Sequence, residues 1–151
     1  MPRRLIFITI AVTALVLSAS AVALLKFTPA SLKTAKVTVG KTKQTIVVDN
    51  RGVTVYELGG ESAGKLICQS KACIGTWIPV RISGSKPLPI TKGVPGPSMV
   101  FRRVSLGYYQ EQLDHHPVYY YAKDKGTPGK VLGNGIHYQN TKYTWHVVKG
   151  S

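Results

Sequence analysis

Hydrophobic residues are most concentrated at the start of the 151-residue chain. Arg3 and Arg4 precede Leu5 to Leu25, a run of 21 residues without a charged side chain, and Lys26 ends it. A basic start followed by an apolar run is what export machinery recognises, and the basic end stays in the cytoplasm. The pattern predicts that residues 1–25 form one hydrophobic helix, either a signal anchor or a signal peptide.

The segment can either remain as a membrane anchor or be cleaved, and the two fates require different lengths of apolar sequence. As a helix, the 21 uncharged residues would rise about 31 Å and span a bilayer core, so the segment is long enough to remain as a transmembrane anchor. Small residues near Ala21 also suit cleavage by a signal peptidase. Either fate places the rest of the chain outside the cytoplasmic membrane, anchored to it or secreted. Residues 26–35, with Pro29, are predicted to be a tether.

From Lys36 onward, apolar and polar residues tend to alternate with a period of two, which is typical of β-strands. Two pairs of β-rich runs flank turn residues and predict hairpins: 44–49 with 53–56, and 108–113 with 118–122. Further strands are predicted at 77–82, 99–104 and 144–148. After the leader, helical periodicity is not sustained for three turns. The predicted fold class is therefore all-β, with short antiparallel strands and hairpins in a domain that spans residues 36–151.

The pattern also contains an internal repeat. A tyrosine strand, an acidic residue, a Gly-Lys pair and a tryptophan strand occur twice, with Tyr56 and Trp77 in the first unit and Tyr119 and Trp145 in the second. The tyrosines are 63 residues apart and the tryptophans 68. We predict two repeat units, at about 44–82 and 107–148, that share one core.

At these residues the chain resembles the family called secreted repeat of unknown function, which consists of predicted lipoproteins with a Tyr-x-aromatic-x-x-Asp motif. Tyr119, Tyr121 and Asp124 fill the motif in the second unit, and His116 with the following Pro lies where the family's lead-in stands. The first unit has Tyr56, Leu58 and Glu61 at the motif positions. The resemblance covers about residues 44–148 and implies an exported, repeat-built domain, but it implies no reaction. No cysteine directly follows the apolar run, which excludes lipid attachment through an N-terminal cysteine.

The motif residues have two interpretations. Side chains alternate along a strand, so Tyr119 and Tyr121 would lie on one face and Tyr120 on the other. Tyr119 and Tyr121 would either pack in the core or, with Asp124, line a ligand groove. Asp124 would lie in the following turn, where a carboxylate accepts backbone N–H groups. The remaining motif positions, interpreted as core or as possible binding residues, are Tyr56, Glu61, His116, Trp77 and Trp145.

Charge adds a second feature. The chain has 20 Lys and Arg residues against 6 Asp and Glu, a formal net charge of +14, and +12 remains after Arg3 and Arg4 of the leader are removed. Such a surface attracts anions, including lipid head groups, anionic cell-wall polymers and nucleic acid. The lysines are scattered along the chain, which does not favour a specific nucleic-acid site.

Cysteine and histidine provide the other candidate chemistry. Cys68 and Cys73 are the only cysteines, and an exported pair favours a disulfide, although a redox pair is an alternative. Their spacing is not the Cys-x-x-Cys of redox proteins. His115 and His116 beside Asp114 are weak candidates for copper or zinc ligands. We assign no catalytic residues, metal or cofactor.

The sequence leads to three hypotheses. The first is a non-enzymatic exported cell-envelope module that binds anionic polymers or an envelope protein through its basic surface. The second is an extracytoplasmic redox or metal-handling protein that uses Cys68, Cys73 and the histidines. The third, less favoured, is a nucleic-acid-binding protein with exposed Tyr108, Tyr109 and Tyr120 as stacking residues.

Overall fold

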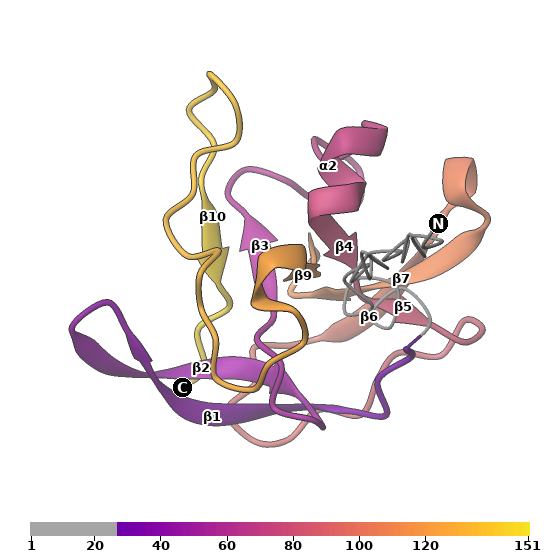
Figure 1. The fold of residues 1–151 in the computed structure, drawn as a ribbon. Coiled ribbons are helices and arrows are strands. Elements are labelled where there is room, and N and C mark those ends of the chain that lie inside the picture. Colours follow the sequence, from indigo (N-terminus) through magenta and orange to yellow (C-terminus); the bar gives the residue numbers. More distant parts are fainter. Residues whose placement is uncertain (1–26) are drawn as a thin grey trace, which may run out of the picture.

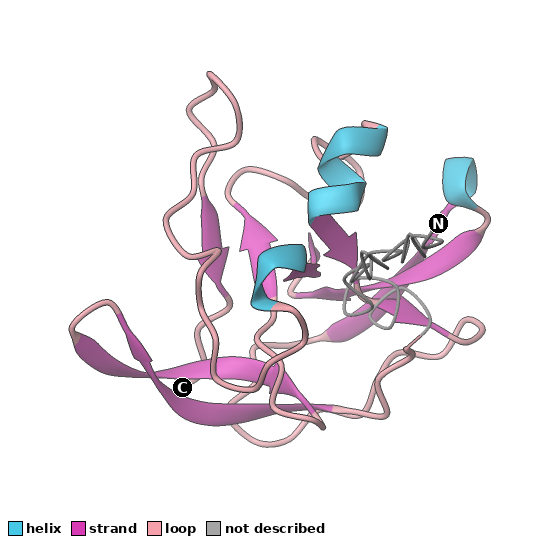
Figure 2. Cartoon of the chain, viewed as in Figure 1, coloured by secondary structure: helices cyan, strands magenta, loops and turns pink. Residues whose placement is uncertain are grey.

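A computed structural model of the chain describes residues 27–151, and the hydrophobic leader predicted at 1–25 lies outside the described residues. Antiparallel β-structure dominates the described part, which confirms the predicted all-β class (Figures 1 and 2). Between residues 27 and 151, no helix has the length and apolar character needed to cross a membrane.

Residues 27–151 form ten strands and three short helices. The strands are β1 (Leu32–Val39), β2 (Thr42–Asp49), β3 (Tyr56–Leu58), β4 (Trp77–Pro79), β5 (Arg81–Ile82), β6 (Ser98–Arg103), β7 (Tyr108–Leu113), β8 (His116–Pro117), β9 (Tyr119–Tyr121) and β10 (Trp145–Val147). The helices are α2 (Lys71–Thr76) and the 3-10 turns η1 (Val104–Leu106) and η2 (Ala122–Asp124). One sheet is the hairpin β1–β2, a central sheet has the order β10-β3-β9-β4, and a third has the order β5-β7-β6 with β8 on β7.

Strand β1 begins inside the segment predicted as a tether. Leu32 is fully buried, its N–H donates to the carbonyl of Pro89, and its own carbonyl accepts the N–H of Thr91. A residue with both backbone groups bonded and its side chain in the core belongs to the domain. The chain therefore joins the folded part at Leu32 rather than at Lys36.

Both predicted hairpin turns form, and they differ by one residue. In the first, the N–H of Asp49 donates to the carbonyl of Val53 around three residues that include Gly52, whose φ of 87° favours glycine. In the second, Leu113 pairs with His116 around two residues, Asp114 and His115, which have φ of 47° and 67°. Two positive φ values are the signature of a type I′ turn, which matches the twist of a tight hairpin.

In the central sheet, the strand pairings made by one repeat unit are also made by the corresponding strands of the other. Tyr56 of β3 is paired with Tyr119 of β9 at the middle. On one side Trp77 pairs with Tyr121, and on the other Trp145 pairs with Leu58. Each tryptophan strand thus pairs with the tyrosine strand of the other unit, so the units are interlocked rather than merely adjacent.

The exchange extends beyond this sheet. Arg81 pairs with Gln110, and Lys149 forms the corresponding bridge with Ile46. The hairpins β1–β2 and β6–β7 are also equivalent, because Leu32 pairs with Asp49 as Ser98 pairs with Leu113. The equivalent segments accordingly begin at Leu32 and Ser98, one strand upstream of the predicted limits at 44 and 107.

Two hydrophobic clusters lie on opposite faces of the central sheet. One contains Tyr56, Tyr119, Tyr121 and the two tryptophans. The other contains Tyr120 and Ile78 with residues of the remaining sheets. The alternation predicted for Tyr119, Tyr120 and Tyr121 is therefore observed, with both faces of β9 buried.

Candidate functional site

The aromatic motif residues form the centre of one core cluster. Tyr56, Tyr119 and Trp145 are completely buried, and Tyr121 and Trp77 are nearly so. The rings of Trp77 and Trp145, one from each unit, stack with centroids 3.9 Å apart. Rings that are packed against one another in this way offer no face to a ligand, so the structure places these five residues in the interior.

Asp124, the acidic end of the motif, ties the units together. It is buried, its Oδ2 accepts the hydroxyl of Tyr56 at 2.5 Å, and its Oδ1 accepts the N–H of Leu132 at 3.0 Å. The Tyr56 oxygen in turn accepts the N–H of Gly133. Burial and then the bond to Asp124 raise the pKa of Tyr56, while burial raises the pKa of Asp124 against the hydrogen bonds that stabilise its anion.

Glu61 is the corresponding acid of the first unit, and it lies near Tyr119 of the second. Its Oε1 accepts the N–H groups of Ile67 and Cys68 at 2.7 and 2.8 Å. Arg103, itself buried, donates to the hydroxyl of Tyr119 at 3.1 Å. Burial and then the charge of Glu61 raise the pKa of Tyr119, and Arg103 lowers it. Each unit therefore places an acid beside the other unit's tyrosine.

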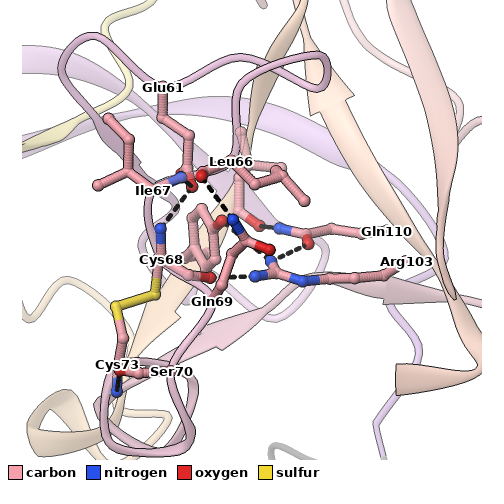
Figure 3. The surroundings of a disulfide bond; sticks show 11 residues. Glu61, Leu66, Ile67, Cys68, Gln69, Ser70, Cys73, Arg103 and Gln110 are labelled. Carbon is pink, nitrogen blue, oxygen red and sulfur yellow. Dashed lines mark hydrogen bonds between the residues drawn. A yellow bond between two sulfur atoms is a disulfide. The ribbon is translucent and has the colours of Figure 1, made fainter. Parts of the chain in front are cut away.

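The cysteines form the predicted disulfide, Cys68–Cys73, with Cα atoms 5.5 Å apart. Figure 3 shows the loop between Glu61, which holds its backbone N–H groups, and Arg103, which donates to the carbonyl of Cys68. Ser70 caps the short helix α2 by accepting the N–H of Cys73. Both cysteines are buried, so the bridge is a staple within this loop; its loop-closure contribution is on the order of 2 kcal/mol.

The histidine turn does not gather a metal site. His115 is exposed, whereas His116 is half-buried and its Nδ1 lies 2.9 Å from the carbonyl oxygen of Glu61. Among residues 27–151, no three His, Cys, Asp or Glu side chains are placed to hold one metal ion. Because a carbonyl can only accept, this contact makes Nδ1 of His116 the donor.

The stacking residues expected for nucleic acid are not all available. Tyr120 was expected to be exposed, but it is buried, and its hydroxyl donates to Oδ2 of Asp49 at 3.1 Å. That prediction is wrong because both faces of β9 are covered. Tyr108 is half-buried under the guanidinium of Arg81, 4.3 Å from its ring centroid.

A cleft of about 620 Å³ contains the titratable groups that the sequence did not bring together. Glu57 of β3 and His146 of β10 are cross-strand partners in it, on the sheet face opposite the stacked tryptophans. Asp114 and His116 enter from the second hairpin turn. The other residues that line it are Gln44, Pro95, Leu113, Asn134, Val147, Val148 and Lys149.

The electrostatics of the cleft depend on Glu57. Burial raises the pKa of Glu57 above its ordinary value, while His116 and His146 lower it and Asp114 adds to the rise. Sequence reasoning missed this group because Glu57 and His146 are single polar residues within short apolar strands. A β-strand pattern around each of them was the available signal, but only the pairing register makes them neighbours.

The acidic side chains outside the cleft are buried. All six lie within residues 27–151, and four of them are buried: Asp49, Glu61, Glu111 and Asp124. The two that remain, Glu57 and Asp114, both line the cleft. The surface outside the cleft is consequently more cationic than the composition alone implies.

The hairpin β1–β2 shows this most clearly. Lys33, Lys36, Lys41 and Lys43 are all exposed on it, and the one carboxylate between residues 32 and 49 is the buried Asp49. Asp49 also forms an ion pair with Arg51, whose Nη2 lies 2.9 Å from the Oδ2 of Asp49. The tip of the hairpin projects away from the central sheet (Figure 1), and the turn there carries Lys41.

Comparisons with models of known protein families, with characterised proteins and with solved structures find no match to this chain.

Proposed function

We propose that this chain is an exported, non-enzymatic module of the cell envelope that binds anionic polymers through the lysines of the hairpin β1–β2. The observation that carries the proposal is the concentration of four exposed lysines on one projecting hairpin whose single acid is buried. The basic, apolar leader supports delivery to the outer side of the cytoplasmic membrane, as an anchored or a secreted protein.

The geometry suits a repeating polyanion. Side chains alternate along a strand, so Lys36 lies on the same face of the hairpin as Thr38 and its partner Lys43, whereas Lys33 points to the other face. Lysine ammonium groups on flexible stems act as point charges, which favours many weak contacts over recognition of one planar group. Such binding releases counterions and weakens steeply as salt is added.

The resemblance to the secreted repeat family supports this role, because it implies export and a repeat architecture. An extracytoplasmic redox or metal-handling role has less support, because Cys68 and Cys73 are buried and bonded to each other. An envelope protein with an acidic surface is the other partner that the hairpin suits.

The test is retention of residues 27–151 on immobilised polyglutamate and polyphosphate between 50 and 300 mM salt. Replacing the four hairpin lysines by Gln is expected to reduce retention at least tenfold at low salt. The matched control replaces Lys65, Lys71, Lys86 and Lys92, which are also exposed, and removes the same charge from other places.

Equal losses in the two variants would contradict a hairpin site and leave only a general attraction of the basic surface. Retention that does not change with salt would contradict polyanion binding altogether. Single-stranded DNA serves as a third matrix, and much stronger retention there than on polyphosphate would favour the nucleic-acid hypothesis instead.

A further inference from the structure

The cleft at Glu57 has a counterpart elsewhere in the molecule, because the pairings of the central sheet repeat. His146 pairs with Glu57 on one side of the sheet as Ile78 pairs with Tyr120 on the other. The two pairs point to the same face, and both lie against the cluster that includes Leu113 and Val148. The same position on the sheet therefore occurs twice in the chain, with Tyr120 in one half and Glu57 in the other.

In the counterpart, the chain fills the space by itself. The ring of Tyr120 is 1% exposed within the apolar cluster, and its hydroxyl donates to Asp49. At the cleft the ring is replaced by the shorter side chain of Glu57, and a volume of about 620 Å³ is open. That volume is in the range of small-molecule sites, which are typically about 300–1,000 Å³.

The polar groups of the cleft define what would occupy it. Glu57 and Asp114 are the chain's two acids that are not buried, so the cleft interrupts a surface that is otherwise strongly basic. His116 and His146 flank Glu57, and Lys149 is the cation on the rim. His116 lines the cleft with its Nδ1 held by the carbonyl of Glu61. Two carboxylates suit a cationic donor with several N–H bonds.

The floor supplies the apolar part of the site. Leu113 and Val148 are buried members of the hydrophobic cluster and also line the cleft, beside Pro95. A flat or puckered ring on this floor would cover apolar surface as Tyr120 does in the counterpart, which is the usual driving force of small-molecule binding.

We infer that the cleft binds a primary amine carried on a six-membered ring, with the ring in the place that Tyr120 fills in the other unit and the ammonium group at Glu57 and Asp114. The site lies on the central sheet and its acids attract cations, so it is distinct from the lysine hairpin proposed to hold polyanions. Aromatic amines and amino sugars share this chemistry.

The experiment titrates residues 27–151 at pH 7 with tyramine and, separately, with glucosamine, followed by the NMR signals of the His116 and His146 rings. Binding of either amine with a dissociation constant of about 1 mM or tighter is expected, and the stronger one identifies the source of the ring. p-Cresol and propylamine, which each lack one part, are expected to bind at least tenfold more weakly.

Two variants test the geometry. Glu57→Gln keeps the volume and removes the charge, and it is expected to weaken binding at least tenfold. Glu57→Tyr restores the residue of the counterpart and is expected to fill the cleft and abolish binding, with an unchanged or raised melting temperature. Lys71→Gln, at an exposed position of helix α2, is expected to leave affinity unchanged.

Failure of both amines to shift the histidine signals at 10 mM would overturn the inference, as would equal binding to wild type and Glu57→Gln. If Glu57→Tyr does not fold, the charge variant still decides. The hairpin lysine variant is expected to bind the amine normally, so a failure of the polyanion proposal and a failure of this one are separable.

Discussion

The two halves of the central sheet share a backbone and differ on one face. On the face of the stacked tryptophans, both halves contribute equivalent aromatic residues to a single core. On the other face, one half buries Tyr120 and Ile78, whereas the other opens Glu57 and His146 to a cleft. The shared core constrains residues that both units need, while a face that only one half covers is free to take on polar groups.

The equivalence of the two halves would fail at its centre if the two tryptophans contributed unequally to stability. Trp145→Ala is expected to lower the free energy of unfolding by about 3–5 kcal/mol, because it removes a buried ring that stacks on Trp77 and contacts Tyr119 edge-on. Trp77→Ala is expected to cost a similar amount. Urea unfolding monitored by circular dichroism measures both.

Leu132→Ala is the control, since this exposed side chain should change stability by less than about 0.5 kcal/mol. A large cost for one tryptophan and a small cost for the other would contradict a core shared equally by the two units.

A second difference between the units is the buried acid Glu111. Its N–H donates to the carbonyl of Val80, as the N–H of Val47 donates to that of Val148, so the equivalent residue is apolar. The Glu111 carboxyl lies 2.5 Å from Oγ of Ser98, and that hydroxyl also lies 2.8 Å from the carbonyl of Leu88. One hydroxyl proton cannot serve both acceptors, so a protonated Glu111 that donates to Ser98 completes the chain of bonds.

Burial raises the pKa of Glu111 to about 7, against the lowering effect of its hydrogen bonds with Ser98 and with the N–H of Leu88. The folded state therefore holds a proton that the unfolded state releases near pH 4.5. Stability from this group is full below about pH 4.5 and is lost as the pH rises to about 7, by on the order of 3 kcal/mol. The raised pKa values of Asp124 and Glu57 act in the same direction.

Glu111→Gln is expected to flatten this part of the profile, because an amide keeps a donor for Ser98 and an acceptor for Leu88 without titrating. Chemical denaturation at intervals between pH 4 and pH 8 measures the slope for both proteins. An undiminished slope in the variant would show that Glu111 titrates normally.

The smallest expected effect concerns the acid that ties the units together. Tyr56→Phe removes the hydroxyl that Asp124 accepts and leaves a buried carboxylate oxygen without this donor. The expected loss is about 1–3 kcal/mol in the free energy of unfolding at pH 7. Tyr119→Phe, which affects the Arg103 contact of the other half, is the matched comparison. A loss near zero for Tyr56→Phe would contradict the structural role of the motif acid.

Periodicity and turn chemistry predicted much of the fold. The β-branched runs around Gly52 and the short turn at Asp114 identified both hairpins, and the two cysteines identified their disulfide. The alternation of Tyr119, Tyr120 and Tyr121 placed their rings on opposite faces. Alternation did not show that the second face of β9 is also covered, which is why Tyr120 was expected to be exposed.

The chain's own sequence determined the local elements, the repeated aromatic positions and the excess of basic charge, since each depends on residues close together in the chain. The tertiary structure alone decided how the units interlock and which polar residues meet. Glu57 and His146 are neighbours because β10 crosses to the tyrosine strand of the other unit. Such pairing is set by packing between segments about 90 residues apart, and no local sequence pattern reveals the free energy of that packing.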